Sequence, residues 1–283
     1  MPEAVAPSRR TLKLTLAYDG TAFVGWQRQA SGTSIQGLLE DGLARIEGGP
    51  VTVIGAGRTD AGVHACGQVA SAIVSLALDV NTLRRALNAV LPPDVRVLAV
   101  EERDDGFHAR YWARAKTYRY LITTAAVVPP FEWRYCWQLP NRLDVDRMTD
   151  AAIAFEGEHD FAAFRATGSS VKTSRRTVVS SRLQRAGETP SALRAFSSIA
   201  APADYLAFQV TATGFLRHMV RAMVGTLVEI GLGRREVRSI AHALRSGDRA
   251  DAGPTAPACG LCLVHVDYGE AGPAALACDD ASA

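Results

Sequence analysis

The first hundred residues alternate between apolar and polar positions with a period that changes several times. Where every second residue is apolar, as with the leucines of 12–16, the pattern predicts a strand with one buried face. Where apolar residues recur three and four positions apart, it predicts an amphipathic helix. The predicted elements are a strand at 11–18, a helix capped by Ser34, strands at 51–56 and 67–76, a helix capped by Asp79 or Asn81 and ended by Pro92, and a strand at 95–101. Their order, β-α-β-β-α-β, is typical of a ferredoxin-like unit.

The second half of the chain repeats this order with longer connections. The predicted elements are a strand at 115–123, a helix at 144–156, strands near 175–184 and 204–213, a strongly apolar helix from Leu216 to Ile230, a short helix at 235–246 and a strand at 261–268. The pattern thus predicts an α+β protein with two ferredoxin-like units. Each antiparallel sheet has helices on one face and leaves the other free. Side by side, the units would form one extended, mainly antiparallel sheet with helices behind and a central cleft, which suits folded RNA better than a small metabolite.

These elements place a first subdomain at 11–106 and a second at 107–268. Residues 1–10 are expected to be a disordered tail and 269–283 a loose one, with a surface loop at 185–203. No apolar run approaches the roughly 18 residues that cross a bilayer, and the N-terminus lacks the apolar stretch of a secretory signal. We therefore expect a soluble, cytoplasmic protein.

The composition, 48% hydrophobic and 21% charged over 283 residues, is that of an ordinary globular protein. A net charge of +2 does not by itself indicate a polyanionic partner. All but three of the 31 Lys and Arg residues are arginine, which favours phosphate contacts, although a codon bias explains this equally well. The five cysteines are odd in number, and Cys259-x-x-Cys262 has no second pair at zinc-site spacing, so we expect neither a disulfide framework nor a metal.

The segment from Gly55 to Ala70 carries the strongest chemical signal in the chain. It lies between two predicted strands and combines the cation of Arg58 with the carboxylate of Asp60 among small residues, so a ligand could approach the backbone. The plain alternative is a glycine-rich turn in which Asp60 only hydrogen-bonds its own backbone. His64, in the same segment, is interpreted as a packing residue of the loop.

Four segments, in order along the chain, resemble the motifs of the TruA-type tRNA pseudouridine synthases, the tRNA pseudouridine 38-40 synthase family. They are Tyr18-Asp19-Gly20 with Phe23 and Gly25-Trp26-Gln27, then Gly57 to Ala65, then Lys116 to Tyr120, and then Gly214 to Arg221. The resemblance covers nearly all of 11–268 and departs at Lys116, where many members have arginine, another cation. It implies isomerisation of uridine to pseudouridine in the anticodon stem-loop of tRNA, at positions 38, 39 and 40, by a homodimer that needs no cofactor.

The resemblance also implies roles for four side chains. Asp60 corresponds to the nucleophile and Arg221 to its ion-pair partner, while Tyr118 stacks on the target base and Arg58 helps to hold that nucleotide out of the stem. Burial can raise an aspartate pKa by about 3–5 units from roughly 3.9, and an adjacent guanidinium lowers it by about 1–3 units, so an anionic Asp60 depends on Arg221. Without the motif, Arg221 is an ordinary helix-edge arginine. Tyr120 shares a strand face with Tyr118 and is expected to fill core.

Several alternatives accompany this interpretation. A catalytically silent RNA-binding module is the main one, and the complete set of Asp60, Tyr118 and Arg221 argues against it. Hydrolysis of a small nucleoside is disfavoured by the open-faced architecture. A phosphatase of the D-x-D-G-T type is excluded because Ala17 stands where its nucleophilic aspartate must be. Three basic clusters are expected to contact phosphates collectively: Arg110 with Arg114 and Lys116, Lys172 with Arg175 and Arg176, and Arg234 with Arg235 and Arg238.

Overall fold

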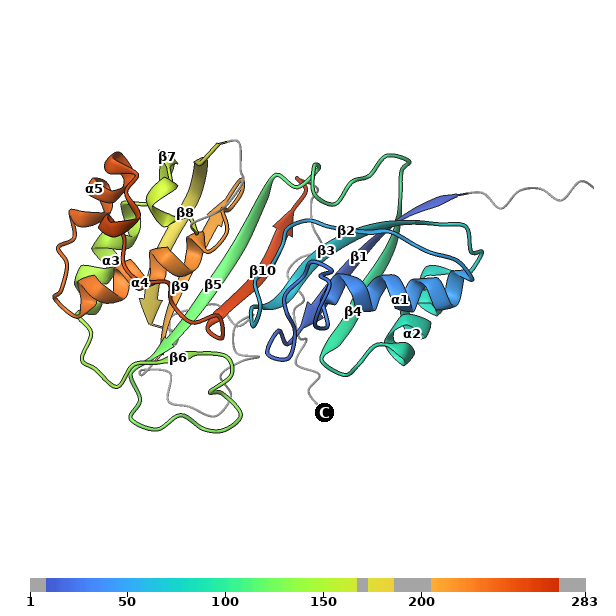
Figure 1. Ribbon diagram of the computed structural model, residues 1–283, viewed down its shortest axis with the longest axis horizontal. Helices are drawn as coiled ribbons and strands as arrows, with labels where there is room; N and C mark the ends of the chain where they lie inside the picture. The colour runs from blue at the N-terminus through green and yellow to red at the C-terminus, as the bar shows by residue number, and fades with distance from the viewer. Residues whose placement is uncertain (1–8, 167–172, 186–204, 270–283) are drawn as a thin grey trace, which may run out of the picture. The chain divides into compact units, whose positions relative to one another are not determined.

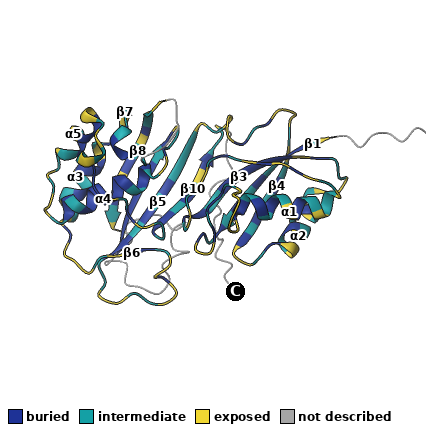
Figure 2. Cartoon of the chain, viewed as in Figure 1, coloured by how far each residue is buried: buried dark blue, intermediate teal, exposed yellow. Residues whose placement is uncertain are grey.

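The computed structural model describes residues 9–166, 173–185 and 205–269 (Figure 1). In this part of the chain ten strands pair mostly antiparallel and five α-helices accompany them, which confirms the predicted α+β class. Figure 2 shows that buried residues concentrate on the strands and on the helix faces turned toward them. Most of the predicted tails at 1–10 and 269–283, the predicted loop at 185–203 except Arg185, and Lys172 lie outside the described residues.

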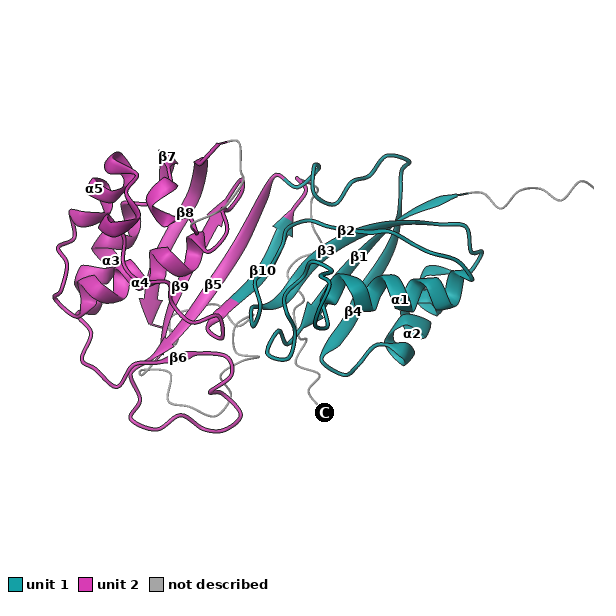
Figure 3. Ribbon diagram, viewed as in Figure 1, with its two compact units in different colours: residues 1–113, 262–266 teal, residues 114–261, 267–283 magenta. Residues whose placement is uncertain are grey.

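The chain divides into two compact units (Figure 3). Unit 1 comprises Met1–Ala113 and Cys262–Val266, and unit 2 comprises Arg114–Leu261 and Asp267–Ala283. The last strand, β10 (Leu261–Asp267), therefore falls mostly in unit 1, although it follows all of unit 2 in the sequence. It runs parallel to β3 (His64–Val74), with Cys262 opposite His64. Because these two strands are far apart in the sequence, the local pattern of apolar residues cannot predict that they pair.

Unit 1 has the predicted β-α-β-β-α-β order. Its elements before β10 are β1 (Arg10–Tyr18), α1 (Ile35–Glu47), β2 (Val53–Gly55), β3, α2 (Val80–Val90) and β4 (Val95–Arg103). In the sheet, β1 lies between β4 and β3 and pairs antiparallel with both. On its other edge, β3 pairs with two strands. Its first residues pair with β10, and its later residues pair antiparallel with β2. This strand order, with each helix connecting two strands that are not neighbours, is the ferredoxin-like topology expected from the sequence.

The core of unit 1 follows from the alternation in β1. Leu12, Leu14 and Leu16 are fully buried, and the helices α1 and α2 lie side by side over the sheet (Figure 1). Both helices begin where the sequence indicated: the Ser34 hydroxyl accepts from the Gly37 N–H, and the Asp79 carboxylate accepts from two N–H groups at the start of α2. Such caps satisfy backbone donors that the first turn leaves without a partner.

In unit 2 the strands β5, β9, β8 and β7 pair antiparallel in that order. Its elements are β5 (Ala115–Thr123), β6 (Trp137–Gln138), α3 (Val145–Ile153), β7 (Gly157–Asp160), the 3-10 turn η1 (Ala162–Phe164), β8 (Arg175–Arg185), β9 (Tyr205–Ala212), α4 (Met219–Gly231), α5 (Ser239–Ser246) and the 3-10 turn η5 (Arg249–Asp251). The helix α4 is apolar on nearly every side because it packs against α3 on one side and the segment around Pro254 on another. Among the described residues, none of the helices is long and apolar enough to span a membrane.

Several element boundaries differ from the sequence-based ones. β6 and β7 were not predicted, because two and four residues are too few to show a period. The helix expected from Leu216 begins instead at Met219, because His218 has a φ of 64°, in the left-handed region, and separates the first apolar residues from the helix. β3 begins at His64, three residues before the predicted start, where it meets β10.

The hydroxyl of Thr226 is a buried link between α4 and the segment that follows α5. It donates to the Ala222 carbonyl and accepts from the Gly253 N–H, each at 2.8 Å. The near-isosteric change Thr226→Val leaves that N–H without its acceptor and is expected to lower the free energy of unfolding by about 1–3 kcal/mol. Thr226→Ser, which keeps the hydroxyl, should lose less. Urea unfolding followed by circular dichroism measures both, and a valine variant more stable than the serine variant would contradict the assignment.

Candidate functional site

The connection between β2 and β3, residues 56–63, is called here the Asp60 loop. Asp60 is half-buried, Thr59 is buried and Arg58 is exposed, so three consecutive side chains have three different environments. The Ala56 N–H donates to the Val69 carbonyl at 2.8 Å and holds the beginning of the loop against β3. The carboxylate of Asp60 thus stands at the boundary between core and solvent.

Buried polar contacts fix the loop from beneath. The hydroxyls of Tyr18 and Thr59 lie 2.9 Å apart, and the Gln68 amide donates to the Gly57 carbonyl at 2.9 Å and to the Tyr18 hydroxyl at 3.4 Å. Tyr18, Thr59 and Gln68 are 4%, 6% and 0% exposed, so water does not compete for these bonds. Burial raises the pKa of Tyr18 well above its ordinary value, so the phenol stays protonated. We call these three side chains the Tyr18 network.

The segment from Tyr18 to Trp26 holds the loop from the side by close backbone contact. The Trp26 N–H donates to the Thr59 carbonyl at 3.1 Å, and the Gly20 N–H donates to Nδ1 of His64 at 3.0 Å. Gly25 has a φ of 103°, and a Cβ placed on it would lie 2.6 Å from the Thr59 carbonyl oxygen. The first family motif and the second are therefore in contact, and glycine allows the approach.

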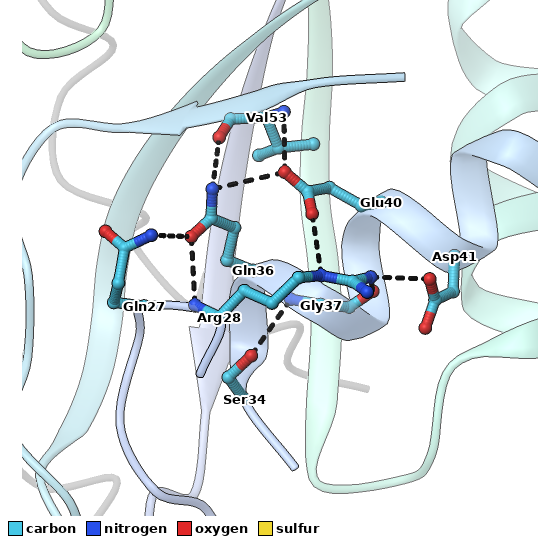
Figure 4. Close-up of polar contacts among 8 residues, drawn as sticks. All are labelled: Gln27, Arg28, Ser34, Gln36, Gly37, Glu40, Asp41 and Val53. Carbon is cyan, nitrogen blue, oxygen red and sulfur yellow. Dashed lines mark hydrogen bonds and ion pairs between the residues drawn. The ribbon is translucent and has the colours of Figure 1, made fainter. Parts of the chain in front are cut away.

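A second polar network attaches the residues after Trp26 to α1 and β2 (Figure 4). The Gln36 side chain accepts from the Arg28 N–H at 3.0 Å and donates to the Val53 carbonyl at 3.0 Å. The guanidinium of Arg28 lies 2.9 Å from Glu40, whose carboxylate also accepts from the Val53 N–H. These contacts hold the end of the first motif on the helix that Ser34 caps, and so support the side of the Asp60 loop.

The candidate residues of unit 2 lie on β5 and α4. Tyr118 is 6% exposed, and its ring meets that of Phe215 edge-on, with centroids 4.9 Å apart. Tyr120, two residues on, is fully buried and its hydroxyl donates to the Pro257 carbonyl at 2.8 Å, so it fills core as the sequence indicated. The two tyrosines share one strand face and are both buried, but they contact different partners.

Arg221 is half-buried on α4 and bonded to the backbone of Ala256 in both directions. Its Nε–H donates to the Ala256 carbonyl at 2.7 Å, while the Ala256 N–H donates to the Arg221 carbonyl at 3.1 Å. Burial raises the pKa of Tyr120, and the positive charge of Arg221 opposes this rise. The guanidinium is therefore oriented toward Ala256 and Tyr120 of β5. An ordinary helix-edge arginine would point into solvent instead.

The candidate residues fall in both units, with Asp60 and Arg58 in unit 1 and Tyr118 and Arg221 in unit 2. The ion pair of Asp60 with Arg221 and the cleft between subdomains stay predictions. His64 is buried and its Nδ1 accepts from the Gly20 N–H, so it packs inside unit 1, in agreement with its interpretation as a packing residue. Sequence reasoning missed the Tyr18 network, although Tyr18 and Thr59 stand in the first two family motifs and Gln68 is a buried polar residue on β3.

The sequence indicated no role for the cysteines. In the structure, two of their thiols lie close together. Sγ of Cys66 lies 3.4 Å from Sγ of Cys262, on the neighbouring strands β3 and β10. Cys259 donates to the Cys136 carbonyl, away from Cys262. Within the described ranges, no group of three or more His, Cys, Asp or Glu side chains is arranged to hold a metal ion.

Comparison with known proteins shows which family this chain resembles. A family model described as "tRNA pseudouridine synthase" matches residues 15–112 and 151–269, which include the Asp60 loop and α4. The chain belongs to the tRNA pseudouridine synthase family. Members of this family are isomerases, and the chain is an enzyme of that class.

Relatives named tRNA pseudouridine synthase A match this family member over almost its whole length. The one from Syntrophotalea carbinolica is 42% identical over 91% of this chain and 96% of its own length. The one from Myxococcus xanthus is 43% identical over 93% of this chain and 94% of its own. The one from Solibacter usitatus is 44% identical over 92% of this chain and 100% of its own.

The contact of Gly25 with the Asp60 loop can be separated from backbone strain by a matched pair of variants. Gly25 and Gly48 both have positive φ, but a Cβ on Gly48 meets nothing within 4 Å. We expect Gly48→Ala to cost about 1–2 kcal/mol of unfolding free energy through strain alone, and Gly25→Ala to cost about 1–3 kcal/mol more through overlap with the Thr59 carbonyl. Denaturant unfolding measures both. Equal losses would show that Gly25 does not support the loop.

Proposed function

We propose that this family member isomerises uridine to pseudouridine in tRNA, with Asp60 as the nucleophile. The observation that carries the proposal is the Asp60 loop itself. It combines a half-buried carboxylate with a backbone held by Tyr18 beneath and by Gly25 and Trp26 at the side. A nucleophile must be accessible to its substrate and held in one position, and this arrangement meets both requirements.

The chemistry explains why a carboxylate is sufficient. The N1–C1′ bond of uridine breaks and a C5–C1′ bond forms, while C5 loses one proton and N1 gains one. No electrons are gained or lost overall, so neither a redox cofactor nor a group donor is needed. A carboxylate can act in either of two ways. It can attack C1′ as uracil leaves and hold a covalent intermediate, or it can remove a sugar proton as a base, so that a glycal forms as uracil leaves and the proton returns when the C5–C1′ bond forms.

Three further side chains are assigned supporting roles. Arg221 is proposed as the cation that keeps Asp60 ionised beneath a bound base. A guanidinium has five N–H donors, so the bond from Nε to Ala256 is compatible with this second role. Tyr118 is proposed to stack on the extruded base, where an aromatic platform contributes about 1–3 kcal/mol. Arg58, exposed beside the nucleophile, is proposed to hold the nucleotide out of the stem.

The substrate is proposed to be the anticodon stem-loop, with targets at tRNA positions 38, 39 and 40. Several neighbouring targets require recognition of RNA shape more than of base sequence. We further propose that the protein acts as a homodimer in the cytoplasm and without a cofactor. Incubation with uridine-labelled tRNA and no added cofactor tests the activity, because tRNA binding without pseudouridine would support a catalytically silent RNA-binding module instead.

Removal of the Asp60 charge is expected to stop the reaction. Asp60→Asn keeps the side-chain shape and should lower kcat on the order of 10³-fold or more, since loss of a covalent nucleophile removes the central step, while tRNA still binds. The matched control is Asp94→Asn, which changes an exposed carboxylate of the same unit outside the polar network around Arg28. Pseudouridine formation and tRNA affinity are measured for both. Asp60→Asn activity within tenfold of wild type would remove the nucleophile assignment.

Removal of the Arg221 cation is expected to have a related effect. Arg221→Ala leaves Asp60 without its proposed partner, and breaking a buried ion pair costs about 3–5 kcal/mol, or on the order of 10²- to 10⁴-fold in kcat if the loss is expressed in the transition state. Arg221→Lys should retain more activity, and the control Arg182→Ala removes an exposed arginine of the same unit. If Arg221→Ala and Arg182→Ala have equal kcat, the counter-ion role is wrong.

A further inference from the structure

The connection between β4 and β5 presents two aromatic side chains to solvent. Tyr111 is 77% exposed and Trp112 is 46% exposed. They stand in the segment 107–112, which we call the aromatic turn and which lies within unit 1. The two rings are consecutive in the sequence, and a partner that covers both would remove a large apolar area from water.

The aromatic turn is held in a defined conformation. Nδ1 of His108 accepts from the N–H groups of Arg110 and Tyr111, both at 3.2 Å, and the His108 ring stacks on the Tyr111 ring with centroids 4.2 Å apart. The turn is anchored to the sheet, since the buried Ala109 N–H donates to the Ser71 hydroxyl on β3 at 3.1 Å. A ring fixed in advance loses little conformational entropy when a ligand stacks on it.

The second aromatic side chain is fixed in the same way. Trp112 packs edge-on against the buried ring of Phe107, with centroids 5.5 Å apart, and its backbone N–H donates to the His108 carbonyl. The guanidinium of Arg103 lies 5.4 Å from the centre of the Phe107 ring. The exposed part of Trp112 therefore belongs to a packed group and is not a loose side chain.

The charge beside Tyr111 indicates the kind of ligand. The guanidinium carbon of Arg110, an exposed residue, lies 5.9 Å from the centre of the Tyr111 ring. A ring that offers a stacking face next to a guanidinium fits one nucleotide, with the base on the ring and the phosphate on the arginine. The exposed acids Asp104 and Asp105 precede the turn and disfavour phosphate there, which places the expected phosphate on the Arg110 side.

We infer that the aromatic turn is a stacking platform for an unpaired nucleobase of the RNA substrate, separate from the uridine that reacts. The inference rests on the proposed function in one respect, that the partner is tRNA. Unpaired bases are the part of a folded RNA that aromatic side chains can reach, because paired bases are covered by their neighbours. The platform contributes affinity and leaves the chemical step unchanged.

The test compares tRNA affinity among variants of the aromatic turn. Tyr111→Ala should weaken binding of a fluorescently labelled tRNA, at constant salt, by about 5- to 150-fold, the range for loss of one base–aromatic stack. Tyr111→Phe should bind as wild type does, because stacking needs the ring and not the hydroxyl. Phe131→Ala, which removes a 74% exposed ring from unit 2, is the matched control and should also bind normally. In turnover, Tyr111→Ala should raise KM and leave kcat unchanged.

Two results would overturn the inference. One is a Tyr111→Ala affinity within twofold of wild type. The other is a change in sedimentation that shows Tyr111→Ala altering the oligomeric state, which would make the turn a contact between copies of the chain. Binding is measured in the Asp60→Asn background, where no product forms. If the wild type makes no pseudouridine but Tyr111→Ala still weakens tRNA binding, the proposed function is wrong and the stacking platform is supported. If the wild type makes pseudouridine and Tyr111→Ala binds tRNA normally, the platform is wrong and the proposed function is supported.

Discussion

The contact between the hydroxyls of Tyr18 and Thr59 is the interaction on which the arrangement of unit 1 around Asp60 depends. The two groups are buried, and a buried polar group without a partner costs about 1–3 kcal/mol, so each hydroxyl restricts where the other can lie. Tyr18 ends β1 and Thr59 directly precedes the candidate nucleophile. The contact therefore transfers the rigidity of a central strand to a loop that has no regular structure of its own.

This constraint explains why two motifs distant in the sequence occur together. The segment from Tyr18 to Trp26 supplies backbone contacts to Thr59 and Val63, and glycines at 20 and 25 let the two backbones approach to a distance that a side chain would prevent. The polar network around Arg28 and Glu40 then attaches the same segment to α1 (Figure 4). The position of a single carboxylate thus depends on the first strand, the first helix and the loop together.

In unit 2, partners distant in the sequence give two tyrosines of one strand different surroundings. Alternation along β5 places Tyr118 and Tyr120 on one face, and the period alone cannot distinguish them. The distinction comes from residues far along the chain. The Pro257 carbonyl accepts a hydrogen bond from the Tyr120 hydroxyl, and the Phe215 ring packs edge-on against the ring of Tyr118. Arg221 is oriented in the same way, by a bond to Ala256 that an isolated amphipathic helix would not provide.

The sequence by itself determined the longer elements and their order, though not the short strands β6 and β7, since caps such as Ser34 and Asp79 and the periods of two and 3.6 residues act over a few positions. It also indicated Asp60, because that residue stands in a motif that can be recognised without a fold. Only the tertiary structure decided the parallel pairing of β10 with β3, the start of α4 after His218, the contacts of Tyr18 with Thr59 and Gln68, and the exposed aromatic turn. Each of these depends on partners distant in the chain, and a local pattern contains no information about which distant residues will meet.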